Sequence, residues 1–107
     1  MAQIIWTEPA LLDLNEIAEY IALDKPGAAS HLVQTVFSKT ERLEEFPESG
    51  RKLPELKKSR YKEIIVDPCR VFYRIEKDKD KVYILYVMRS ERKLRKYLLS
   101  ERSEESR

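Results

Sequence analysis

The spacing of apolar residues changes once along this chain of 107 residues, and that change narrows the folds it can adopt. Up to about residue 45, apolar side chains recur every three or four positions, which indicates amphipathic helices. From residue 61 onward they alternate with polar side chains, which indicates strands with one face on a core. Helices followed by strands predict an α+β fold, in which a helical layer covers one face of an antiparallel sheet.

Two helices are predicted in the first half of the chain. After a short apolar stretch at 4–6, Thr7 is a typical N-cap, and the range 8–23 carries apolar residues at helical spacing. The residues 24–27, with the sequence Asp-Lys-Pro-Gly, end this helix. A second helix is predicted from there to just before Pro47. Two helices joined so tightly form an antiparallel hairpin, which needs a surface to cover.

The second half of the chain predicts three strands, at 61–66, 69–76 and 81–88, joined by short turns. The last of them is apolar on both faces, which places it in the interior of the sheet. Because the connections are short, the three strands form an antiparallel meander, and the stretch at 4–6 adds at one edge. The expected order is β-α-α-β-β-β in a single domain over residues 1–107, with a polar, basic connector at 47–60.

A short basic helix is expected near the end of the chain, at about 91–99, with Ser90 as its cap. So short a helix is marginal in water, and its apolar stripe must therefore dock on the sheet or on a partner. The stripe consists of Leu94, Tyr97 and Leu98. The remaining residues, about 100–107, are polar and predict a frayed tail.

Lysine and arginine gather in two stretches, 51–62 and 89–96, although the net charge of the chain is only +2. A solvated, charged surface explains any one of these side chains. Two basic clusters far apart in the sequence favour recognition of a polyanion or of an acidic protein. If the sheet curls, four basic side chains could also converge over one of its faces: Lys62, Arg70, Arg74 and Arg89.

The sequence lacks the residues that several common kinds of functional site require. His31 is the only histidine and Cys69 the only cysteine, so neither a Cys/His metal site nor an internal disulfide is expected. Glycine occurs only at positions 27 and 50, which rules against a glycine-rich phosphate loop. No long apolar run and no basic signal-peptide start is present. The sequence therefore predicts a cytoplasmic protein with no cofactor, no metal and no membrane contact.

Two stretches of the sequence resemble a known family. They are IIWTEPALLDLNEIAEYIA at 4–22 and YKEIIVDPCRVFYRIEKDKDKVYILYVMRSER at 61–92. Together with the expected order of elements, they resemble the RelE/ParE superfamily of bacterial type II toxins over about residues 3–97. The resemblance implies a plasmid- or chromosome-borne toxin that arrests growth until a cognate antitoxin wraps an otherwise disordered segment around it.

The superfamily includes two activities, and the long basic C-terminus of this chain favours the first. ParE-like members poison DNA gyrase and block replication without a hydrolytic site, whereas RelE-like members are endonucleases that cut mRNA on the ribosome. The expected target-binding residues are Arg89, Arg92, Lys93, Arg95 and Lys96. The residues expected to bind the antitoxin are Leu94, Tyr97 and Leu98.

The RelE-like alternative implies a catalytic set on this chain that is incomplete. The matching positions are Lys62, Arg70, Arg89 or Arg92, and Tyr97. Ile64 stands where the resemblance implies a second lysine. Other ribosomal relatives use a histidine near the C-terminus, and this chain has none there. A third alternative is a nucleic-acid-binding module without toxicity. The low net charge and the lack of a groove-reading helix motif weigh against it.

Overall fold

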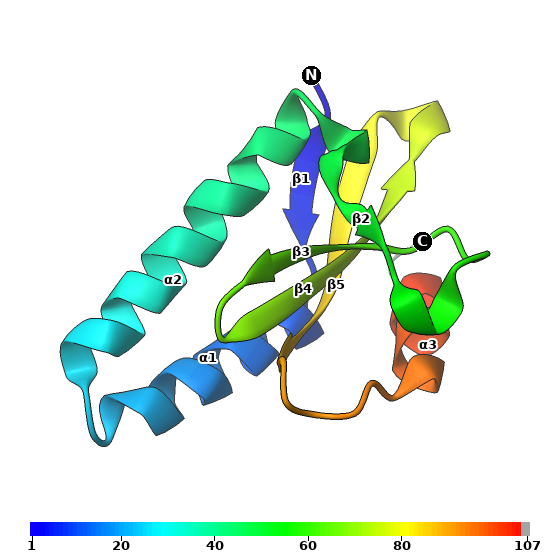
Figure 1. The fold of residues 1–107 in the computed structure, drawn as a ribbon. Coiled ribbons are helices and arrows are strands. Elements are labelled where there is room, and N and C mark those ends of the chain that lie inside the picture. Colours follow the sequence, from blue (N-terminus) through cyan, green and yellow to red (C-terminus); the bar gives the residue numbers. More distant parts are fainter. Residues whose placement is uncertain (106–107) are drawn as a thin grey trace.

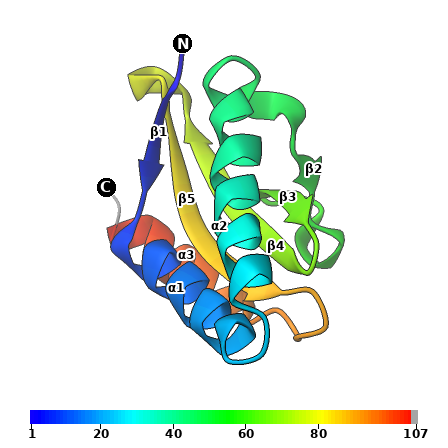
Figure 2. The same ribbon diagram turned by 90° about the vertical axis from the view of Figure 1, so that its left-hand side faces the viewer.

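The computed structural model describes residues 1–105 as a five-stranded sheet with helices on one face and a smaller layer on the other (Figure 1). The strands lie in the order β1-β5-β4-β3-β2. Helices α1 (Glu8–Ala22) and α2 (Pro26–Glu41) form the predicted hairpin and cover one face, as the turned view shows (Figure 2). The connector and the C-terminal helix lie against the opposite face. The α+β architecture expected from the apolar spacing is confirmed.

Each helix of the hairpin begins where its sequence signals predict. The Thr7 side chain accepts a hydrogen bond from the backbone N–H of Ala10, which caps α1. Pro26 lies in the first turn of α2, where its missing N–H needs no partner. Leu14 and Val36 are buried on the faces that meet the sheet. A 3₁₀ turn, η1 (Arg42–Glu44), follows α2 and ends the hairpin.

The predicted meander is present as β3 (Lys62–Val66), β4 (Cys69–Glu76) and β5 (Lys81–Arg89), each antiparallel to the next. The N-terminal strand β1 (Gln3–Trp6) pairs in parallel with β5. Strand β5 therefore has a neighbour on both sides, as its apolar character on both faces predicted. A register shift between β4 and β5 follows Phe72.

The connector is more ordered than its polar sequence suggested. It contains a two-residue strand, β2 (Arg51–Lys52), which pairs with β3 and extends the sheet by one strand. Two 3₁₀ turns, η2 (Pro47–Ser49) and η3 (Pro54–Leu56), flank β2. Leu53 between them is fully buried. A further 3₁₀ turn, η4 (Lys77–Lys79), joins β4 to β5.

The sheet separates two apolar cores. The larger core lies between the sheet and the helix hairpin. The smaller core lies on the other face, where residues from the connector, the sheet and the C-terminal segment meet: Leu53, Phe72, Met88, Leu94 and Leu99, with Leu56, Tyr61 and Tyr86 packed around them. The smaller core joins two stretches of the chain, around residues 53–61 and 94–99, that are far apart in the sequence.

The last helix, α3, spans Lys96–Glu105, so its predicted position at 91–99 was wrong. Residues 90–95 form a turn and a loop that carry the chain from the end of β5 back across the smaller core. Leu94 packs there ahead of the helix, and Leu99 and Ser103 form the buried side of α3. Residues 100–105 of the predicted frayed tail are helical, and 106–107 lie outside the described residues. Burial of Leu99 and Ser103 outweighs the weak local helix signal.

Candidate functional site

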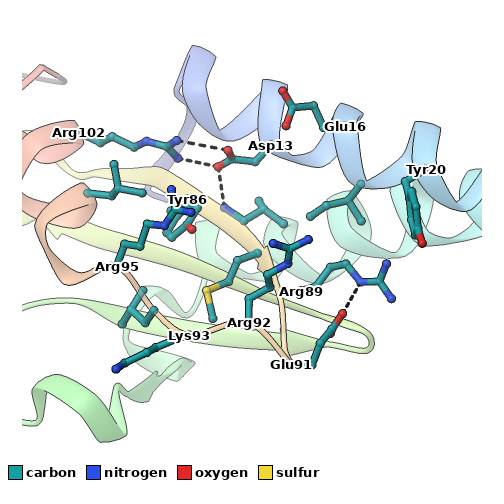
Figure 3. Close-up of a pocket in the computed structure, with 15 residues that line it drawn as sticks. Asp13, Glu16, Tyr20, Tyr86, Arg89, Glu91, Arg92, Lys93, Arg95 and Arg102 are labelled. Carbon is teal, nitrogen blue, oxygen red and sulfur yellow. Dashed lines mark hydrogen bonds and ion pairs between the residues drawn. The ribbon is translucent and has the colours of Figure 1, made fainter.

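A cleft of about 1060 Å³ lies between α1 and the C-terminal segment. Its floor is the second half of β5, its acidic wall is α1, and its basic wall is the loop 90–95 with the start of α3 (Figure 3). Asp13, Glu16 and Tyr20 stand on the α1 side. We call this cleft the basic groove, because four of the residues that line it are the predicted target-binding cations Arg89, Arg92, Lys93 and Arg95.

Most cations of the basic groove face solvent without an acidic partner. Within residues 1–105, no carboxylate lies at ion-pair distance from Arg92, Lys93 or Arg95. Arg89 differs, since its Nε lies 2.8 Å from Glu91 and its guanidinium lies 5.4 Å from the ring centre of Tyr20. A row of unpaired cations beside a cleft attracts a negatively charged ligand.

Asp13 and Arg102 close one end of the groove. Asp13 accepts hydrogen bonds from Arg102 at 2.6 and 3.3 Å and from the backbone N–H of Val87 at 3.0 Å. Arg102 also donates to the carbonyl oxygen of Leu85 at 3.0 Å. Strand β1 pairs with residues 81–84 of β5. Beyond that point, the two side chains supply hydrogen bonds that a neighbouring strand would otherwise make, and they tie α1 to α3.

Replacing Asp13 with alanine should therefore loosen α3 and lower the free energy of unfolding by about 1–3 kcal/mol, because Val87 N–H loses its partner in a half-buried place. Urea denaturation at neutral pH measures the change. Glu16→Ala is the matched control, because Glu16 stands on the same helix, is exposed and has no ion pair within residues 1–105. Equal stability of the two variants would contradict the role given to Asp13.

The residues implied by the RelE-like alternative do not meet in one place. Lys62 alternates with Ile64 and Val66 of the larger core, and its Nζ lies 3.9 Å from Glu48 at the far edge of the sheet. Tyr97 is exposed on α3 and does not line the groove. Arg89 and Arg92 do line it.

Arg70 is buried on the opposite face of the sheet from Lys62 and is held by two carboxylates. Its Nε lies 2.6 Å from Glu63, and Nη1 and Nη2 lie 2.7 and 2.8 Å from the two oxygens of Glu55. These contacts raise the pKa of the guanidinium above its ordinary value and lower that of Glu55 to about 2. Arg51 lies 2.6 Å from Glu63, so the four charges form one network that fastens the connector to β4.

Arg74 is also held in a structural contact. The predicted convergence of Lys62, Arg70, Arg74 and Arg89 over one face of the sheet therefore does not occur. Its side chain is buried, lies 2.6 Å from Glu76 and donates to the carbonyl oxygen of Ser103 at 3.3 Å. The guanidinium also stacks 4.4 Å from the ring centre of Tyr83. Arg74 therefore supports the end of α3.

The residues expected to bind an antitoxin lie in different surroundings. Leu94 is buried in the smaller core of the free protein. Leu98 is half-buried and lines the basic groove. Tyr97 is 61% exposed. These three do not form the single helical stripe that was predicted, because the helix begins two residues after Leu94.

Sequence reasoning missed the groove residues of α1 and Arg102. Asp13, Glu16 and Tyr20 follow one another at spacings of three and four, which places them on one side of the helix, but nothing local shows that this side faces a cleft. Arg102 was assigned to the tail. Cys69 is buried, which raises the pKa of its thiol to about 11, as is typical of a cysteine that packs in a core.

Within residues 1–105, no three histidine, cysteine or acidic side chains come together as metal ligands. In the same part of the chain, none of the helices is both long and apolar enough to cross a bilayer.

Comparison with known proteins places the chain in a family. Residues 4–94 match the family described as ParE toxin of type II toxin-antitoxin system, parDE. The chain belongs to this ParE toxin family. It is a toxin of the type II toxin–antitoxin class within the wider RelE/ParE superfamily.

The chain is similar in sequence to two toxin-named proteins and similar in fold to one solved structure. The toxin-named protein Y4kP of Sinorhizobium fredii is 40% identical over 87 residues, which cover 80% of this chain and 85% of that protein. Toxin RelE2 of Caulobacter vibrioides is 37% identical over 68 residues, 64% of this chain and 73% of that protein. The chromosomal ParDE system of P. aeruginosa shares the fold, with a TM-score of 0.71 at 21% identity, covering 85% of this chain and 98% of that one.

Proposed function

We propose that this ParE-family chain inhibits DNA gyrase in the cytoplasm, stalls it on cleaved DNA, and does so by recognition without hydrolysis. The observation that supports this proposal most is the contrast between its basic residues. Arg70, which a phosphodiester-cleaving site would use, has all three guanidinium nitrogens on carboxylates, whereas Arg92, Lys93 and Arg95 of the basic groove make no ion pair within residues 1–105. A cation held by two carboxylates has little charge left to stabilise a pentavalent phosphate.

The basic groove is the proposed place of contact with the target, through Arg89, Arg92, Lys93 and Arg95. Lys96, at the start of α3, is exposed close to it. The target surface should be acidic or carry phosphates, because these side chains supply positive charge with few apolar anchors around them.

A cognate antitoxin is the second proposed partner. A solved structure with the same fold belongs to a chromosomal ParDE toxin–antitoxin system. The half-buried Leu98 and the exposed Tyr97 offer apolar contacts next to the cations, which suits a segment that is acidic and apolar and that orders on binding. Occupation of the groove by that segment would cover the target-binding residues.

The alternative function is ribosome-dependent cleavage of mRNA, and one observation favours it. The relative from Caulobacter vibrioides carries the name RelE2. Lys62, Arg70, Arg89 or Arg92, and Tyr97 are the residues that such an activity would require here. Their distribution over both faces of the sheet counts against it, since general acid–base catalysis needs its groups within hydrogen-bond reach of one phosphate.

The deciding experiment incubates purified protein with purified gyrase and supercoiled plasmid, with and without ATP, and looks for linear DNA after removal of gyrase by protease. We expect linear plasmid that depends on both proteins. Cells that express the chain should stop growing, show a DNA-damage response, and recover when the small partner encoded beside it is co-expressed. Immediate arrest of translation with mRNA cut at the ribosomal A site would support the RelE-like alternative instead. Normal growth together with binding to bare DNA would support the non-toxic module.

A further inference from the structure

A second basic surface lies outside the groove, on the connector. Residues 51–62 contain six lysines or arginines and one acidic residue, Glu55. Among them Lys57, Lys58 and Arg60 are exposed and follow η3 directly. We call these three residues the connector cations. The function proposed above uses the C-terminal cluster and leaves these residues without a role.

The one carboxylate of residues 51–62 is paired with a cation from outside that stretch. Glu55 receives two hydrogen bonds from Arg70, at 2.7 and 2.8 Å. Since Arg70 comes from β4, this pairing uses none of the connector cations. Within residues 1–105, neither Lys57 nor Lys58 has a carboxylate at ion-pair distance. The positive charge of these two side chains therefore remains uncompensated.

The smaller core sets the connector cations beside the C-terminal segment. Leu56 of η3 packs into the same cluster as Leu94 and Leu99. Arg60 donates a hydrogen bond to the side-chain oxygen of Ser103 on α3 at 3.0 Å. Figure 1 shows the η3 region next to α3. Two sequence-distant basic stretches thus form neighbouring parts of one surface.

The chemistry of the connector part of this surface fits a phosphate backbone better than a protein. Protein interfaces depend on apolar or aromatic anchors at their centre. Of the large apolar side chains that the structure exposes within residues 1–105, none belongs to 51–62. Single-stranded nucleic acid is held by exposed aromatic rings, which the connector also lacks, since Tyr61 is half-buried. Cations without anchors or stacking rings suit duplex DNA, whose phosphates are bound without regard to sequence.

We propose that the connector cations bind the phosphate backbone of duplex DNA without sequence preference. This inference rests on the proposed function in one respect, because DNA bound to gyrase is the duplex that the toxin would meet. The contact would hold the toxin on the DNA that gyrase has cut, while the groove engages the enzyme.

The test measures binding of the full chain to a fluorescent random-sequence duplex of about three helical turns, roughly 30 base pairs. Fluorescence anisotropy is recorded from about 50 to 200 mM KCl, and wild-type affinity should fall steeply with salt. The variant Lys57→Glu/Lys58→Glu should bind at least about tenfold more weakly, with the slope of log affinity against log salt reduced by about 2. The matched control is Lys25→Glu/Lys79→Glu, which changes the same charge at two exposed places away from the connector.

Equal loss in both double variants would overturn the proposal, because net charge alone would then explain binding. Tighter binding to single-stranded RNA of the same length, or no binding to duplex at low salt, would also overturn it. Circular dichroism shows that each variant is folded. The gyrase assay, run in parallel, separates the two proposals: DNA binding that needs Lys57 and Lys58 without gyrase inhibition refutes only the function, and gyrase inhibition without DNA binding refutes only this inference.

Discussion

Replacing Arg70 with methionine should lower the free energy of unfolding by about 3 kcal/mol or more, a loss in the range for breaking a buried ion pair on one side. Glu63 is fully buried, and its Oε1 would lose the Arg70 Nε at 2.6 Å. Arg51 would still contact Oε2, but from a side chain that is largely exposed. Glu55 would lose both its bonds, and the connector would lose its attachment to β4. Urea denaturation followed by circular dichroism measures the effect.

A second variant distinguishes the free-energy cost of leaving one buried charge without a partner from the net contribution of the ion pair to stability. In Arg70→Met/Glu63→Met, both buried charges are replaced by apolar side chains, and much of the lost stability should return. Arg51, which remains, can be solvated because it lies at the surface. If the loss of stability in the double variant equals the sum of the losses in Arg70→Met and Glu63→Met, the two residues are not coupled. That result would contradict the network of charges.

The same network makes part of the stability depend on pH. The hydrogen bonds from Arg70 lower the pKa of Glu55 from 4.5 to about 2. Because the folded state holds the ionised carboxylate more strongly than the unfolded state does, this contribution is complete above about pH 4.5 and is lost as the pH falls towards 2. In Arg70→Met the pKa of Glu55 should return towards its ordinary value. The stability difference between wild type and variant should therefore shrink as the solution is acidified.

Alanine at four exposed cations of the C-terminal segment should abolish growth arrest and leave the fold intact. The cations lie on the loop 90–95 and the first residue of α3, where they make no ion pair within residues 1–105. Charges at such places change the free energy of unfolding by less than about 0.5 kcal/mol each. Their loss should remove most of the attraction to an acidic or phosphate-bearing target. The four substitutions are Arg92→Ala, Lys93→Ala, Arg95→Ala and Lys96→Ala.

The measurement compares plating efficiency after induction with that of wild type and of a matched variant. The matched variant also removes four exposed cations, at positions outside the groove: Lys25, Lys39, Arg42 and Lys79. It should remain toxic, since only the position of the charges differs. Undiminished growth arrest by the C-terminal variant, at equal protein level, means that the basic groove does not bind the target.

Much of the scaffold could be predicted because the signals for it are local or periodic. The helix hairpin, the three-strand meander and the interior position of β5 each depend on an apolar period or on turn residues. The two-residue β2 was missed, since a strand so short has no period to detect. The last helix was predicted too early in the chain, because lysine and arginine at 92–96 are compatible with a loop as well as with the first turn of a helix. Burial of Leu99 and Ser103 fixes where the helix lies.

The sequence by itself determined the order of the elements, the faces that they bury and the two stretches where basic residues gather. The tertiary structure decided which of these cations are available. Arg70 and Arg74 are held by carboxylates and carbonyl groups, whereas Arg92, Lys93 and Arg95 of the basic groove face solvent. The physical reason is that an apolar period acts through neighbouring positions on one element. The partner of a charge, as in the contact of Asp13 with Arg102 across 89 positions of the chain, exists only once the elements have packed.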